Sequence, residues 1–157
     1  MNFVIFDNII QDPKKYIQEI NDYGFQDIFD GEKVFKNIQP RDANDDFALF
    51  LLSLFKEYEV AFNFIRKSPL NQEEPNFIHT DEMMGDLTCI LYLNEVHPDN
   101  DGTTIYDTKN KPIFTMYSKF NSAFIFGSNM PHSRNILENF GHGENARLVQ
   151  VAFLKKK

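Results

Sequence analysis

The chain has 157 residues, enough for one compact domain, and its 17 Phe and 6 Tyr can fill the interior of a β-sandwich or barrel. A formal net charge of −7 argues against a general nucleic-acid binder, which usually carries a basic stripe, but does not exclude a nucleic-acid substrate. Cys89 is the single cysteine, so no intrachain disulfide can form. No stretch has the pattern of a secretory signal or a membrane span. We therefore expect a cytoplasmic protein without membrane attachment.

The N-terminal part predicts a short strand followed by a helix. Asn2–Phe6 is mostly apolar and reads as a strand. Asp12 can cap the free N–H groups of a helix whose first residue is Pro13, and Gly24 ends that helix.

A second helix is predicted after a polar, irregular segment, Ile28–Asp42. Asn44 or Asp45 can cap this helix, which is expected to run through Glu57. Its apolar stripe predicts core packing and consists of Phe47, Phe50, Leu51, Leu54 and Tyr58.

The rest of the chain alternates with a period of two and is broken by Asn, Asp, Gly and Pro. Many short strands after a helical start favour an antiparallel sandwich or jelly roll braced by helices, a mainly β fold of the α+β type. The expected strands are Val60–Arg66, Asn76–Thr80, Asp86–Glu95, Thr103–Tyr106, Ile113–Met116, Ser122–Phe126, His132–Leu137 and Arg147–Leu154.

His79 and Asp81 are candidate metal ligands. They are two residues apart, so on a strand they point to the same side. A chain with 4 His and 23 acidic residues holds about 0.6 such pairs by chance. A surface hydrogen bond between the two side chains is therefore an alternative interpretation.

His132 is the candidate third ligand, because it follows the apolar strand Ser122–Phe126 and a turn that can bring it back to the same end of a sandwich. Two imidazoles and one carboxylate can hold one face of an iron(II) octahedron and leave three positions open. His97 and His142 compete for this role but lie in loops, which hold ligands poorly.

Arg147 begins the last expected strand and shares one face with Val149, Val151 and Phe153. If that face is interior, the guanidinium needs either a protein carboxylate or a ligand carboxylate as its partner. A strand-end arginine in solvent is the alternative. Arg134 shares the face of His132 and could meet a substrate, although a surface position is the simpler expectation.

From Asn76 to Leu154 the chain resembles the iron(II)/2-oxoglutarate-dependent dioxygenases, most closely the prolyl-4-hydroxylase-like branch. His79-Thr80-Asp81 matches the family's His-x-Asp, and Pro131-His132 matches its distal histidine. Thr88–Asn94 resembles the next strand, Asp101–Tyr106 resembles the Gly-Gly-x-Thr turn and strand, and Arg147 matches the basic residue that binds 2-oxoglutarate.

The resemblance implies a double-stranded β-helix in one domain over residues 1–157, with a helical support region in 1–70 and the β-helix core in 75–154. It implies an iron site formed by His79, Asp81 and His132. Arg147, helped by the Tyr92 hydroxyl, would bind the far carboxylate of 2-oxoglutarate. The implied cofactors are Fe(II), 2-oxoglutarate and O2, with ascorbate as a further candidate.

The implied reaction is hydroxylation of a peptidyl (prolyl) or small-molecule substrate with release of succinate and CO2. Asp81 stands where related halogenases have a small residue, which favours hydroxylation or another oxidation over halogenation. The chain departs from the family pattern at Asp101, where the turn's first glycine is expected, and in the longer interval between His132 and Arg147.

Two other interpretations of the chain stay open. A cupin-like metalloenzyme would share the β-helix and the metal but would have no role for Arg147 or Tyr92. A non-catalytic β-sandwich binding module would leave the histidines and the aspartate on the surface. The sequence does not indicate the substrate or the oligomeric state.

Overall fold

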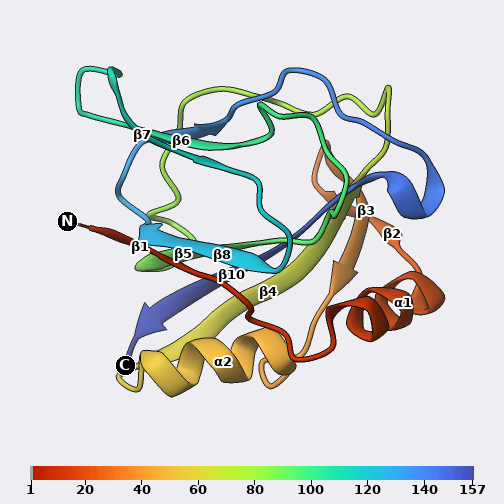
Figure 1. Ribbon diagram of the computed structural model, residues 1–157. Coiled ribbons are helices and arrows are strands. Elements are labelled where there is room, and N and C mark those ends of the chain that lie inside the picture. Colours follow the sequence, from red (N-terminus) through yellow and green to blue (C-terminus); the bar gives the residue numbers. More distant parts are fainter. Residues whose placement is uncertain (1) are drawn as a thin grey trace.

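The structure is a computed structural model that describes residues 2–157. Two antiparallel sheets face each other, and two helices cover the outer side of the larger sheet (Figure 1). The larger sheet has the order β1-β8-β5-β10-β4-β3-β2, and the smaller one has the order β7-β6-β9. This arrangement confirms the predicted mainly β fold of the jelly-roll type with supporting helices.

Strand β10 forms the centre of the larger sheet and pairs with β4 and β5. The region before residue 70 contributes both helices and four strands. The bounds of the strands are β1 Phe3–Phe6, β2 Gln26–Asp30, β3 Lys33–Pro40, β4 Tyr58–Ser68, β5 Leu87–Tyr92, β6 Gly102–Tyr106, β7 Pro112–Tyr117, β8 Ser122–Gly127, β9 His132–Arg134 and β10 Arg147–Lys156. A short 3-10 helix, η1, spans Gly143–Asn145.

Helix α1 spans Pro13–Tyr23 and confirms the expected helix at both ends. The Asp12 side chain accepts a hydrogen bond from the Lys15 N–H, which satisfies one of the free donors of the first turn. Gly24 ends the helix at φ 88°, a conformation that glycine adopts without steric cost, and its N–H donates to the Ile20 carbonyl.

Helix α2 spans Asp46–Leu54, with Asp45 as its cap, so the expected extension to Glu57 was wrong. The chain leaves the helix at Phe55 because Tyr58 already pairs with Lys156 in the sheet. Phe47 and Leu51 are fully buried, as the apolar stripe predicted.

The core is divided by the larger sheet into two clusters. Helix residues such as Ile20 and Leu51 pack with Leu91 and Ala152 on the outer face. The inner cluster, between the sheets, consists of Tyr92, Ile105, Met116, Phe124, Phe126 and Val149. Successive residues of the central strands therefore alternate between the outer cluster and the inner cluster.

The expectation that Ile28–Asp42 is irregular was wrong. The segment forms most of the hairpin of β2 and β3, which extends the larger sheet beyond β4 through Ile38 and Arg66. Gly31 lies in the turn at φ 62°. Most of this hairpin is exposed, and its apolar residues include the adjacent pairs Ile28-Phe29 and Val34-Phe35, so the period of two is weak.

Two predicted strands were wrong in extent. Asn76–Thr80 forms only an isolated bridge between His79 and His132. The Asn76 side chain donates to the Ile136 carbonyl, so this segment is held by a side-chain contact rather than by a ladder. Strand β9 ends at Arg134 instead of reaching Leu137. No helix within residues 2–157 is both long and apolar enough to cross a membrane.

Candidate metal centre

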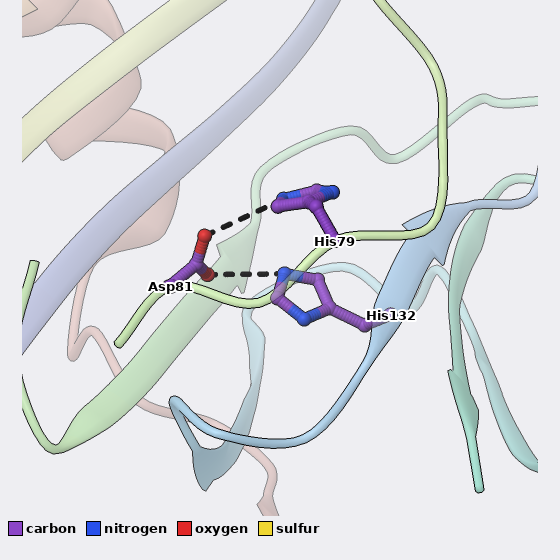
Figure 2. A group of neighbouring side chains, drawn as sticks. All are labelled: His79, Asp81 and His132. Carbon is purple, nitrogen blue, oxygen red and sulfur yellow. Dashed lines mark ion pairs between the residues drawn. The ribbon is translucent and has the colours of Figure 1, made fainter. Parts of the chain in front are cut away.

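His79, Asp81 and His132 converge at one end of the space between the sheets (Figure 2). One ligand atom from each lies within 4.8 Å of the others. The His132 Nε2 atom is 3.0 Å from Asp81 Oδ2, and the His79 Nε2 atom is 3.4 Å from Asp81 Oδ1. This is the donor set of two imidazoles and one carboxylate that the sequence predicted.

Backbone contacts fix the positions of the three side chains. His79 and His132 exchange hydrogen bonds between their N–H and C=O groups, at 3.0 Å and 2.9 Å. The Asp81 N–H donates to the Ser128 carbonyl at 2.8 Å. The turn before β9 therefore brings the distant His132 beside the short His79–Asp81 segment.

Both imidazoles are oriented through their second nitrogen. The Nδ1 atom of His79 is 2.9 Å from the Phe77 carbonyl, and that of His132 is 2.9 Å from the Met130 carbonyl. A carbonyl accepts a hydrogen bond, so each Nδ1 carries a proton, and Nε2 is the ring nitrogen that remains to bind a metal. Such second contacts are typical of histidines that bind a metal.

The Asp81 carboxylate lies in a partly buried environment. Burial alone would raise the pKa of Asp81, but hydrogen bonds with His132 and His79 outweigh it and hold the pKa well below its usual range. The hydrogen bond to Asp81, opposed by burial, raises the pKa of His79 above 6.5. Thr88 Oγ1 also donates to Asp81, at 3.1 Å. Asp81 is therefore ionised and fixed in place.

The cluster opens into a cavity of about 200 Å³ between the two sheets. Arg147, Val149, Val151 and Phe153 all line it, which confirms that they share one interior face. Thr88, which donates to Asp81, pairs with Phe153 in the C-terminal half of β10. Arg147 is the first residue of β10 and therefore lies at the other end of this strand. The remaining lining residues are Phe64, Arg66, Glu74, Ile90, Thr103, Ser133 and Arg134.

Arg147 is buried and has a protein partner. Its Nε donates to Asp101 Oδ1 at 3.0 Å, and the side chains are 5% and 1% exposed. Of the two partners that the sequence left open, a protein carboxylate is therefore present. Since Arg147 also lines the cavity, Asp101 holds it from behind.

Tyr92 does not line the cavity. It is 1% exposed, and its hydroxyl is 2.7 Å from Thr103 Oγ1. Burial raises the pKa of Tyr92, so the phenol stays protonated. Thr103 is the residue of this pair that reaches the cavity.

Two competing histidines lie outside the cluster, and Arg134 lies inside the cavity. The His97 Nδ1 atom is 2.9 Å from the neighbouring Pro98 carbonyl, and His142 is exposed. The expected surface position of Arg134 was wrong, because its side chain is 16% exposed and lies 3.6 Å from Glu74. Burial, together with nearby Arg147, lowers the pKa of Arg134.

The sequence did not indicate the roles of Thr88 and Glu74 or the pairing of Asp101 with Arg147. Glu74 lies in the loop after β4, where no strand period indicates which side a residue faces. Asp101 stands out in the sequence only because it replaces the first glycine of the family's turn. The negative charge at this position was the available sign that it could pair with an arginine.

The comparisons with solved structures identify the fold. The chain is similar to the non-heme alpha ketoglutarate dependent epimerase SnoN from nogalamycin biosynthesis, with 11% identity and a TM-score of 0.69 over 99% of this chain and 78% of that one. A prolyl hydroxylase from Trichoplax adhaerens, solved with a hypoxia inducible factor peptide, matches with 14% identity and a TM-score of 0.68 over 99% and 84%. HygX from Streptomyces hygroscopicus, solved with nickel and 2-oxoglutarate, matches with 10% identity and a TM-score of 0.65 over 99% and 83%.

These likenesses establish that the chain has the fold of the 2-oxoglutarate/iron(II) oxygenases, including prolyl hydroxylases. No known protein-family profile matches the chain. No curated protein matches its sequence either.

Proposed function

We propose that this protein is an iron(II)- and 2-oxoglutarate-dependent oxygenase. One observation carries the proposal: the His79–Asp81–His132 cluster and the Arg147 guanidinium line the same cavity. A metal site alone would fit many enzymes. A fixed guanidinium in that cavity adds a site for a carboxylate.

The three side chains fit iron(II) by their chemistry. Two imidazoles, each with its Nε2 atom facing the cluster, and one carboxylate form the donor set typical of non-heme iron(II) oxygenases. When bound, iron and 2-oxoglutarate supply the oxidation of a substrate by O2, with succinate and CO2 as the other products.

The rest of the cavity fits the cosubstrate. Arg147 is held at its Nε by Asp101, which leaves the terminal N–H groups for the far carboxylate. Ile90, Val149 and Val151 offer apolar contacts between the charged ends. The Tyr92 hydroxyl contacts Thr103, which lines the cavity, so Tyr92 positions Thr103 and does not bind the cosubstrate directly.

Substrate would enter beside His79. The His79 side chain is 39% exposed, whereas His132 is 6% exposed. The neighbouring Phe77 and Ile78 are exposed apolar residues that can contact a substrate. We propose hydroxylation of a peptidyl (prolyl) or small-molecule substrate, which the likeness to prolyl hydroxylases supports.

We further propose one domain over residues 1–157 and a cytoplasmic location. Cys89 is a free, buried thiol, which fits a reducing compartment.

The test is an anaerobic titration with iron(II) and then 2-oxoglutarate, followed by absorption spectroscopy. A coloured charge-transfer band that requires both additions is the expected result. Iron binding without a band would favour a cupin-like metalloenzyme. Absence of iron binding would favour a non-catalytic binding module. Mass spectrometry of candidate peptides and metabolites for one added oxygen atom would then identify the reaction.

A further inference from the structure

At the end of the cavity away from the metal cluster, the positively charged side chains outnumber the negatively charged ones. Three guanidinium groups, from Arg66, Arg134 and Arg147, meet two carboxylates, from Glu74 and Asp101. Because Arg66 and Arg134 share the single carboxylate of Glu74, one positive charge of this group is not compensated by these two carboxylates. A buried cation of this kind is costly unless an anion compensates it.

The pairing distances assign the surplus charge to Arg134. Asp101 is 3.0 Å from Arg147, and Glu74 is 3.2 Å from Arg66 but 3.6 Å from Arg134. Each carboxylate thus has a nearer guanidinium than that of Arg134.

The remaining contacts of Arg134 are incomplete. Its Nη1 donates to the neutral Asn139 amide oxygen at 2.7 Å. Its Nε and Nη2 atoms are buried and have no hydrogen-bond partner within residues 2–157. A guanidinium normally uses these two groups to bind a carboxylate side-on.

The position of Arg134 brings it toward the carboxylate site. It lies two residues after His132 on β9 and opposite Thr103 on β6, so it shares their cavity-facing side. Asp101, which holds Arg147, is two residues before Thr103. The two arginines therefore reach the same cavity from facing sheets.

We propose that Arg134 binds the far carboxylate of 2-oxoglutarate together with Arg147 and supplies most of the electrostatic attraction. The inference rests on the proposed function. Arg147 is already neutralised by Asp101, so its contribution is mainly hydrogen-bond geometry. Arg134 brings the uncompensated charge that a single carboxylate neutralises.

The experiment measures binding of two ligands to the Ni(II)-loaded protein by calorimetry. One ligand is 2-oxoglutarate, and the other is 2-oxopentanoate, which has a methyl group in place of the far carboxylate. Arg134→Met is expected to raise the Kd for 2-oxoglutarate about 10- to 100-fold and to leave the Kd for 2-oxopentanoate within about twofold. Arg134→Lys, which keeps the charge, is expected to recover part of the loss.

Two results would overturn the inference while leaving the proposed function intact. One is an equal loss for both ligands, which would indicate a general structural effect. The other is an unchanged Kd for 2-oxoglutarate in a variant that still binds nickel. If the wild-type protein binds nickel but not 2-oxoglutarate, the proposed function itself fails, and the inference fails with it.

Discussion

His79 is the most exposed of the three candidate ligands, and Asp81 bonds to both histidines. Replacing either residue removes one third of the donor set. We predict that His79→Ala and Asp81→Ala each weaken iron(II) binding by more than about 100-fold. His97→Ala is the matched control, because His97 lies outside the cluster. Equilibrium dialysis with iron(II) would measure this, and wild-type affinity in both variants would disprove the ligand assignment.

Protonation of His79 gives metal binding a defined pH dependence. The hydrogen bond with Asp81 raises the pKa of His79 above 6.5, and a ligand must lose its proton to bind. Metal affinity should therefore already decline above pH 6.5 as the solution is acidified. The folding stability of the metal-free protein changes with pH in the opposite direction. A raised pKa of His79 in the folded state stabilises folding below pH 6.5, and this contribution is lost as the pH rises through the raised pKa.

Metal titrations between about pH 8 and about pH 5.5 would check this prediction. Thermal unfolding of the metal-free protein over the same range provides the comparison. A metal affinity that is constant down to pH 6 would contradict the raised pKa.

Removal of Arg147 alone would leave the buried Asp101 carboxylate without its ion-pair partner, which would destabilise the protein. The informative variant therefore combines Asp101→Asn with Arg147→Met. We predict a Kd for 2-oxoglutarate at least about 30-fold higher, corresponding to about 2 kcal/mol, with nickel binding retained. Asp101→Asn alone is the control, since it keeps the guanidinium. Calorimetry that finds equal affinities in the double variant and the wild type would exclude Arg147 from the carboxylate site.

At the residue scale, the sequence predicted the groups with a short spacing or a strand context. His79 and Asp81 are two residues apart, and His132 follows a recognisable strand and turn. The partner of Arg147 was unpredictable, because Asp101 lies 46 residues away and the contact depends on how β6 and β10 face each other. The burial of Arg134 was missed for the same reason.

At the scale of single elements, Gly102 fixes the start of β6. Its φ is 148°, and a Cβ at this position would collide with the carbonyl oxygen of Met116 on β7. The same strand carries Thr103 and follows Asp101 directly. The approach of β6 to β7 therefore helps to position the cavity wall.

We predict that Gly102→Ala lowers the free energy of unfolding by about 2–3 kcal/mol. Gly31→Ala is the control, because Gly31 also has a positive φ but nothing lies within 4 Å of its Cβ position. Denaturant unfolding of both variants would distinguish the effect of the collision with β7 from the cost of placing a side chain on a residue with positive φ. Equal losses would show that the collision with β7 is relieved at no cost.

Elements with strong local signals were predicted correctly, and those held by tertiary contacts were not. Asp12, Pro13 and Gly24 mark both ends of α1 within the sequence itself. The hairpin of β2 and β3 has mostly exposed residues, so no apolar alternation revealed it. His79 lies in a single bridge rather than a strand, yet it still reaches the cluster through its backbone contact with His132.

At the scale of the whole molecule, the larger sheet separates the helical core from the cavity. Leu51 of α2 is fully buried on the outer face and does not line the cavity. We predict that Leu51→Ala destabilises the protein by about 2–5 kcal/mol while the affinity for nickel stays unchanged. Thermal unfolding and metal titration below the unfolding transition would test this, and a large loss of nickel affinity would show that the two faces are coupled.

We propose that the metal and 2-oxoglutarate bind together in the cavity between the sheets. The most direct measurement is a crystal structure with Ni(II) and 2-oxoglutarate, with anomalous scattering used to locate the metal. We predict a metal peak about 2.1 Å from the Nε2 atoms of His79 and His132 and from the Asp81 carboxylate. We also predict that the far carboxylate of the ligand lies beside Arg147. A metal bound by other residues, or a ligand outside this cavity, would show that the proposed site is wrong.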